Sequence, residues 1–98
     1  MIVRFSEEEV RLMQTALDRW GMNAQVGQAV EECAELIVAL QKYVRQPESD
    51  AIDSVLDEMA DVEMMLAQMR IVFSISDDAY RERIARKFER LNHYLLDG

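Results

Sequence analysis

The feature that most constrains the fold of this chain is the spacing of its apolar residues, which recur every three or four positions. Strand-like alternation is nearly absent, and only three glycines and one proline interrupt the 98 residues. Apolar residues at this spacing line one face of an α-helix, whereas a half-buried strand requires alternation. The sequence therefore predicts an all-α chain with one small core, a single domain over residues 1–98.

Capping residues and helix breakers divide the chain into four expected helices with short connections. Ser6 followed by Glu9 is a capping box, which predicts a first helix to about Trp20. Gly21 can end that helix in a left-handed conformation. A second helix is expected over residues 23–45, ahead of the proline.

The second half of the chain contains the other two expected helices. Ser49 or Asp50 is expected to cap a third helix that runs to about Val72, and Ser76 is expected to cap a fourth. The expected third helix has two apolar stripes on different sides, so both sides require burial. One chain of this size cannot cover both. The sequence therefore predicts a four-helix bundle completed by oligomerisation, as a homodimer or a homotetramer.

Each expected apolar stripe is a set of residues at helical spacing. The expected second helix carries a stripe predicted to face the core: Val26, Val30, Cys33, Ile37, Leu40 and Val44. The third carries Ile52, Val55, Met59, Val62, Leu66 and Met69 on one side and Ala60, Met64, Ala67 and Ile71 on another.

Charge and cysteine content exclude several classes of function. A net charge of −8 argues against direct nucleic-acid binding, because phosphate contacts need a basic surface. The lone Cys33 cannot form an internal disulfide, and no Cys/His spacing for a zinc site is present. We expect no signal peptide and no membrane span, since no apolar run approaches about 20 residues. A cytoplasmic location is expected.

Two pairs of carboxylates lie inside strongly apolar segments. Glu32 and Glu35 are three residues apart, as are Glu58 and Asp61, so each pair shares a helix surface. No Lys or Arg lies three or four positions from the second pair, and uncompensated like charges are unfavourable. Either these are solvated faces, or the two pairs face each other around a cation. Carboxylate oxygens would select Mg²⁺ or Mn²⁺.

Other metal chemistries do not fit the pattern. A di-iron bundle requires Glu-x-x-His motifs, but the single histidine, His93, follows Glu89 by four residues. An EF-hand requires a glycine-containing loop rather than helical acids. Mg²⁺ held by a few carboxylates typically binds substrate phosphates. Phosphate chemistry is therefore the leading expectation.

The acidic motifs resemble those of the all-α nucleoside triphosphate pyrophosphohydrolases of the MazG type. That superfamily includes the dimeric dUTPases and phosphoribosyl-ATP pyrophosphohydrolases. The segments "EECAEL" and "DEMADV" are similar to its two acidic motifs, with 22 residues between Glu35 and Glu58. "WGMNAQ" and "RKFERL" are similar to its lead-in and its last basic helix. The resemblance spans about residues 20–91.

The resemblance implies Mg²⁺-dependent hydrolysis of a nucleoside triphosphate to a monophosphate and pyrophosphate, by attack of water on the α-phosphorus. The implied metal ligands are Glu32, Glu35, Glu58 and Asp61. Glu31 and Glu35 are the implied catalytic acids, with Glu31 orienting water or remaining an exposed acid. The implied substrate contacts are Gln25, Arg83, Lys87 and Arg90, the basic three of which equally fit a solvated face that pairs with Glu82 and Glu89. Trp20 fits either a place near the base or a core position.

Two alternatives remain open at this point. One is a catalytically silent relative that serves as a regulatory or interaction module. The other is a helical adaptor that binds a partner helix through its methionine-rich surface and binds no metal. No motif identifies the base of a substrate.

Overall fold

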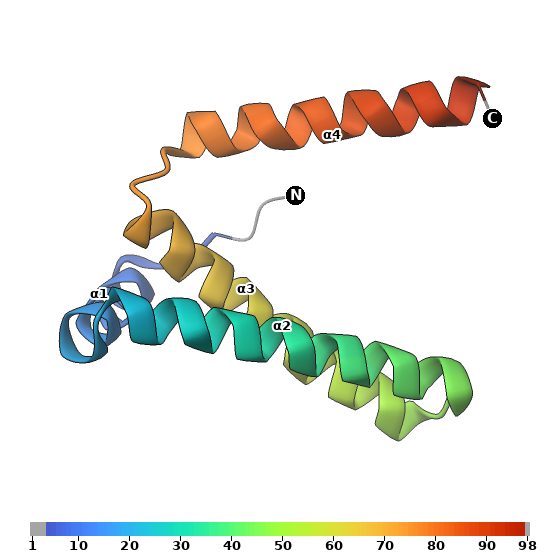
Figure 1. Cartoon of the computed structure of the whole chain (residues 1–98), viewed down its shortest axis with the longest axis horizontal. Coiled ribbons are helices and arrows are strands. Elements are labelled where there is room, and N and C mark those ends of the chain that lie inside the picture. The colour runs from blue at the N-terminus through green and yellow to red at the C-terminus, as the bar shows by residue number, and fades with distance from the viewer. Residues whose placement is uncertain (1–3, 98) are drawn as a thin grey trace.

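The computed structural model describes residues 4–97, which form four α-helices and, within that range, no strand (Figure 1). The helices are α1 (Glu7–Trp20), α2 (Met22–Arg45), α3 (Ser49–Val72) and α4 (Asp77–Asp97). The all-α prediction is confirmed, with helix boundaries close to those expected. Residues 1–3 and 98 were included in the single-domain prediction, and residues 1–3 in the expectation of no signal peptide. They lie outside the described residues.

The ends of α1 show how local chemistry sets the helix boundaries. The Ser6 hydroxyl accepts the Glu9 N–H at 3.1 Å, and the Ser6 N–H donates to Glu9 Oε1 at 2.8 Å, which confirms the capping box. Gly21 ends α1 and also precedes α2, with φ of 88° and ψ of 163°. These angles lie outside the left-handed helical region, in a region essentially restricted to glycine. Gly21 therefore allows an immediate change of direction between the two helices.

The caps of α3 and α4 differ in how well they were predicted. The Ser76 hydroxyl accepts the Ala79 N–H at 3.1 Å, so the predicted cap of α4 is confirmed. The predicted cap of α3 by Ser49 or Asp50 is wrong, because the extended residue before the helix is Glu48, which makes no side-chain cap bond. A tight turn, in which the Glu48 N–H donates to the Gln46 carbonyl at 2.8 Å, precedes the helix. Ser49 is therefore already the first residue of α3.

The packing of the helices is uneven (Figure 1). Helices α2 and α3 pack against each other in opposite directions, and α1 contacts both near the start of α2. In the described part of the chain, α4 packs along none of these helices, and it has no buried residue. A single chain therefore does not form the expected closed four-helix bundle. None of the helices over residues 4–97 is both long and apolar enough to cross a membrane.

The face of α2 that packs on α3 is not the predicted one. Val30, Ile37 and Val44 from the predicted core stripe are 65%, 56% and 78% exposed. The side that faces α3 instead buries Gln25 and Ala39 and half-buries Glu32 and Leu36. The error arose because α2 has apolar residues on more than one side, and helical periodicity alone does not say which side meets α3.

The stripes of α3 are only partly covered. Val55, Val62 and Met69 of the first stripe are half-buried, whereas Ile52 and Met59 are at least half exposed. In the second stripe only Ala67 is buried, and Met64 is 45% exposed. Much of the apolar surface of α3 therefore remains accessible in one chain.

Candidate metal centre

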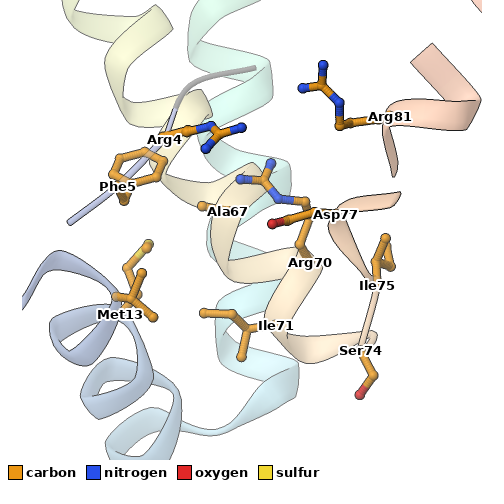
Figure 2. A pocket seen from close by; sticks show the side chains of 11 residues that line it. Arg4, Phe5, Met13, Ala67, Arg70, Ile71, Ser74, Ile75, Asp77 and Arg81 are labelled. Atoms are coloured by element: carbon orange, nitrogen blue, oxygen red, sulfur yellow. The ribbon is translucent and has the colours of Figure 1, made fainter. Parts of the chain in front are cut away.

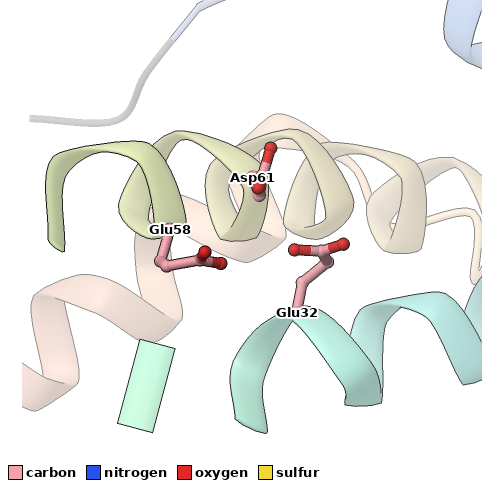
Figure 3. A group of neighbouring side chains, drawn as sticks. All are labelled: Glu32, Glu58 and Asp61. Carbon is pink, nitrogen blue, oxygen red and sulfur yellow. The ribbon is translucent and has the colours of Figure 1, made fainter. Parts of the chain in front are cut away.

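Three carboxylates converge between α2 and α3 (Figure 3). Glu32 points from α2 toward Glu58 and Asp61, which lie one helical turn apart on α3. One oxygen from each side chain lies within 4.8 Å of the other two, and all three residues are half-buried. The structure thus brings one member of the first predicted pair and both members of the second into one cluster.

Two oxygens of this cluster have no hydrogen-bond partner within residues 4–97. Glu32 Oε2 and Glu58 Oε2 are shielded from solvent and accept no hydrogen bond from the described residues. Glu32 Oε1 is satisfied, because Gln28 Nε2 donates to it at 2.8 Å. A buried carboxylate oxygen without a donor or cation is unfavourable. A cation between the two helices would satisfy both oxygens at once.

The electrostatics of the cluster point the same way. The hydrogen bond from Gln28 lowers the pKa of Glu32. The loss of water around its carboxyl and the negative charges of Glu35 and Asp61 outweigh the effect of that bond, so the pKa of Glu32 is raised overall. Loss of water is the main cause that raises the pKa of Glu35, and the charge of Glu58 adds to it. A protonated carboxyl and a bound cation both relieve such repulsion.

No basic side chain compensates these acids within residues 4–97. The ion pairs of that part of the chain are Arg86 with Glu82 and His93 with Asp97, both at 2.8 Å and both within α4. Within residues 4–97, the carboxylate cluster therefore has neither a guanidinium nor an ammonium partner.

A cleft of about 810 Å³ extends from the carboxylates along α1. Its walls are mostly apolar, and Glu32 and Asp61 lie at its edge. The apolar lining includes Phe5, Leu12, Met13, Trp20, Met64 and Met65. Gln25 and Gln68 also line it, and Gln25 Nε2 donates to Gln68 Oε1 at 2.7 Å. An amide pair within an apolar wall can present donors and acceptors to a bound group.

The other predicted site residues lie in different surroundings. Glu35 is outside the three-carboxylate cluster and is exposed, although it is close enough to Glu58 for their charges to interact. Glu31 is also exposed. The predicted basic substrate contacts lie on α4, which does not pack on α2 or α3, so one chain does not bring them to the carboxylates: Arg83, Lys87 and Arg90.

Two residues of the site were not predicted from the sequence. Gln28 precedes Glu32 by four residues, a spacing that brings the side chains together on a helix, so it could have been found. Gln68 is a polar residue in an apolar stretch of α3, but its pairing with Gln25 depends on how the helices meet. Trp20, which was considered for a core position, is 61% exposed and lines the cleft.

Comparison of the chain with protein-family models, with curated proteins and with solved structures finds no match. The likeness to the MazG-type enzymes therefore rests on the sequence motifs alone.

Proposed function

We propose that this chain is a Mg²⁺-dependent nucleoside triphosphate pyrophosphohydrolase of the MazG-like type, acting in housekeeping of the cytoplasmic nucleotide pool. It would cleave between the α- and β-phosphates to give a monophosphate and pyrophosphate. The observation that carries the proposal is the cluster of Glu32, Glu58 and Asp61, in which two shielded carboxylate oxygens have no hydrogen-bond partner among the described residues.

The donor set suits a small hard cation. Mg²⁺ binds oxygen at about 2.0–2.1 Å in an octahedron, so adjacent ligands are about 3 Å apart. The three carboxylate oxygens lie within 4.8 Å of one another, and side-chain movements of up to about 1 Å would bring all three within bonding distance of one ion. Glu35, beside Glu58, is the proposed fourth ligand. Bound Mg²⁺ or Mn²⁺ would neutralise phosphate oxygens and acidify a water molecule.

The residues of the chain have distinct proposed roles around that site. Glu35, beside Glu58 at the exposed margin of the cluster, is the proposed carboxylate that accepts a proton from the attacking water. Glu31, exposed next to Glu32, orients that water. The acids lie on two packed helices rather than on loops, which holds them at nearly constant separation and favours in-line attack.

The cleft beside the carboxylates is the proposed place for the nucleoside. Its apolar wall suits a flat base, and the exposed Trp20 offers an aromatic surface for stacking. Gln25 and Gln68 can hydrogen-bond to the base edge or the sugar. The triphosphate would then extend toward Glu32 and Asp61 at the cleft edge.

A homodimer or homotetramer is part of the proposal. Its support is the apolar surface that one chain leaves open on α2 and α3, together with an α4 that packs on no other described helix. In such an assembly, α4 of a neighbouring copy can bring the equivalents of Arg83, Lys87 and Arg90 to the phosphates. Among the described residues, no other cation lies at the site.

Calorimetric titration and product analysis test the proposal together. Asp61→Asn should abolish Mg²⁺ binding and turnover of the common ribo- and deoxyribonucleoside triphosphates. Asp53→Asn, an exposed change of the same kind on the same helix, should do neither. Orthophosphate and a diphosphate as first products would contradict the cleavage position. Metal binding without turnover would instead support a silent regulatory module, and no metal binding would support a helical adaptor.

A further inference from the structure

Three arginines from separate parts of the chain line a second hollow, of about 550 Å³ (Figure 2). Arg4 precedes α1, Arg70 lies near the end of α3, and Arg81 lies in the first turns of α4. Figure 2 shows the Arg4 and Arg70 guanidinium groups extending into the same opening, with Arg81 across from them. These three cations gather in a chain whose net charge is −8.

The positive charge of this hollow is not balanced by its own lining. Asp77 is the one acidic residue among the described lining residues, against three arginines. None of these arginines forms an ion pair with a described residue. Guanidinium groups stay protonated at all accessible pH values, so they cannot relieve their repulsion by losing a proton. An anion in the hollow would relieve it.

Arg70 is held in place rather than free to turn away. Its guanidinium carbon lies 4.8 Å from the centroid of the Tyr80 ring, a cation–π contact between α3 and α4. Its carbonyl accepts the Ile75 N–H at 2.9 Å in the turn between these helices. The side chain is half-buried, and the apolar side chains of Met13 and Ile71 form part of the wall. A fixed cation beside an apolar wall attracts an anion more strongly than a solvated one does.

We propose that this hollow is an anion site for a phosphate group carrying at least two negative charges, as in orthophosphate, pyrophosphate or the phosphate chain of a nucleotide. Guanidinium groups bind phosphate oxygens in pairs of parallel hydrogen bonds, and a phosphate offers enough oxygens for several arginines. A single carboxylate, with one charge, would leave the local excess of two positive charges only half balanced.

The anion site is separate from the carboxylate cluster. Phe5 and Met13 line both the hollow and the cleft, and so lie between them. None of Glu32, Glu58 and Asp61 lines the hollow. Anion binding there depends neither on a divalent cation nor on the proposed hydrolysis.

Isothermal titration calorimetry with pyrophosphate, on the whole chain and with a chelator present, tests the site without the metal centre. Wild type should bind, and Arg4→Gln and Arg81→Gln should each weaken binding about tenfold or more, because each removes a guanidinium and its charge-assisted hydrogen bonds to the anion. Arg19→Gln is the matched control: it removes the same charge from an exposed position on α1 that does not line the hollow, and it should leave affinity unchanged. Glu58→Gln should bind pyrophosphate as tightly as wild type does. The test of the anion site therefore holds even if the proposed metal centre is wrong.

Parallel titrations with orthophosphate and ATP identify the source of the phosphate group. ATP binding tighter than pyrophosphate, with the same dependence on Arg4 and Arg81, would indicate a nucleotide phosphate chain. Pyrophosphate or orthophosphate binding at least as tight as ATP would indicate a free phosphate anion. Absence of binding by all three anions would overturn the proposal. Equal affinities in Arg81→Gln and Arg19→Gln would do so as well.

Discussion

Helices α2, α3 and α4 are all long, but α2 and α3 are stabilised by packing against each other, whereas α4 is not packed along another helix of the described chain. Helices α2 and α3 pack against each other and half-bury Glu32, Glu58 and Asp61 between them, although these charges repel. Helix α4 has no buried residue, and its described side-chain contacts are mostly local, such as the exposed pair of Arg86 and Glu82. Exposed pairs of this kind contribute little stability.

The difference indicates where function and assembly lie in the molecule. Carboxylates that repel one another and have unsatisfied oxygens lower the stability of a packed interface. Buried polar groups without partners are found mainly at functional sites. Helix α4 is amphipathic, with Phe88, Leu91 and Leu95 exposed on one side. This pattern is typical of a helix whose apolar side packs against another protein surface. We therefore place the proposed metal site at α2–α3 and expect α4 to pack against another copy.

The largest effect is expected from removing a proposed metal ligand of the α2–α3 pair. Glu58→Gln should reduce Mg²⁺-dependent turnover by more than about 100-fold, since even residues that only support a metal ligand contribute 10- to 100-fold. The thermal stabilisation produced by Mg²⁺ should disappear, while the metal-free variant should melt at a higher temperature than metal-free wild type, because a repelling charge is gone. A Mg²⁺-induced shift equal to that of wild type would contradict the assignment.

A change on α4 should alter assembly without altering the carboxylates. Leu91→Asp places a charge on the exposed apolar side of α4 and should convert the proposed oligomer to a monomer of 11.4 kDa in light scattering. Helical content should fall as well, because a helix of 21 residues that buries none of its side chains receives little stabilisation from tertiary packing. Asn92→Asp adds the same charge at the next position and should leave the mass unchanged. A monomeric wild type at micromolar concentration would refute this part of the comparison.

The pH dependence of stability should reveal the repulsion within the α2–α3 pair when no metal is present. The pKa of Glu35 is raised from 4.5 in the folded chain, so the folded state binds its proton more tightly than the unfolded state does. That contribution is complete below the unfolded pKa and is lost as pH rises through the raised folded pKa.

Denaturant titrations with a chelator, at pH values from below 4.5 upward, measure this loss. As pH rises, the free energy of unfolding of Glu35→Gln should increase relative to that of wild type. Glu9 provides an internal contrast, because its hydrogen bonds to the Ser6 backbone and hydroxyl lower its pKa, and its contribution is present above its unfolded pKa and lost on acidification. A pH-independent difference between wild type and Glu35→Gln would show that the repulsion is absent.

The smallest expected effect separates a packed helix from an unpacked one. Ser6→Ala removes the hydroxyl that caps α1, which contacts both α2 and α3, and should lower the free energy of unfolding by about 1 kcal/mol. Ser76→Ala removes the equivalent bond from α4 and should chiefly accelerate amide exchange in the first turn of that helix. Ser54→Ala, at an exposed hydroxyl inside α3, is the control and should change stability by less than about 0.5 kcal/mol. Equal losses for Ser6→Ala and Ser76→Ala would show that α4 is as integral to the fold as α1.

Several features of the candidate site followed from positions close together in the sequence. The spacing of Glu58 and Asp61 placed both on one surface of a helix, and the structure keeps them there. The spacing of Glu32 and Glu35 is equivalent, but only Glu32 joins the three-carboxylate cluster, because the cluster lies between two helices and Glu35 sits at its exposed margin. Periodicity specifies which residues share a face, and not how deeply that face enters an interface.

Helix identity, the capped starts of α1 and α4 and the order of the acidic pairs were determined by the sequence itself, because capping bonds and helical periodicity act between residues close together in the chain. The Ser6 and Ser76 caps are examples. Only the tertiary structure decided that α2 meets α3 through the side that carries Gln25 and Glu32 rather than through its continuous apolar stripe. It also decided that α4 remains unpacked within the described chain and that three arginines from distant segments share one hollow. These features depend on the relative rotation and placement of whole helices, which is a balance of many contacts between residues far apart in the chain.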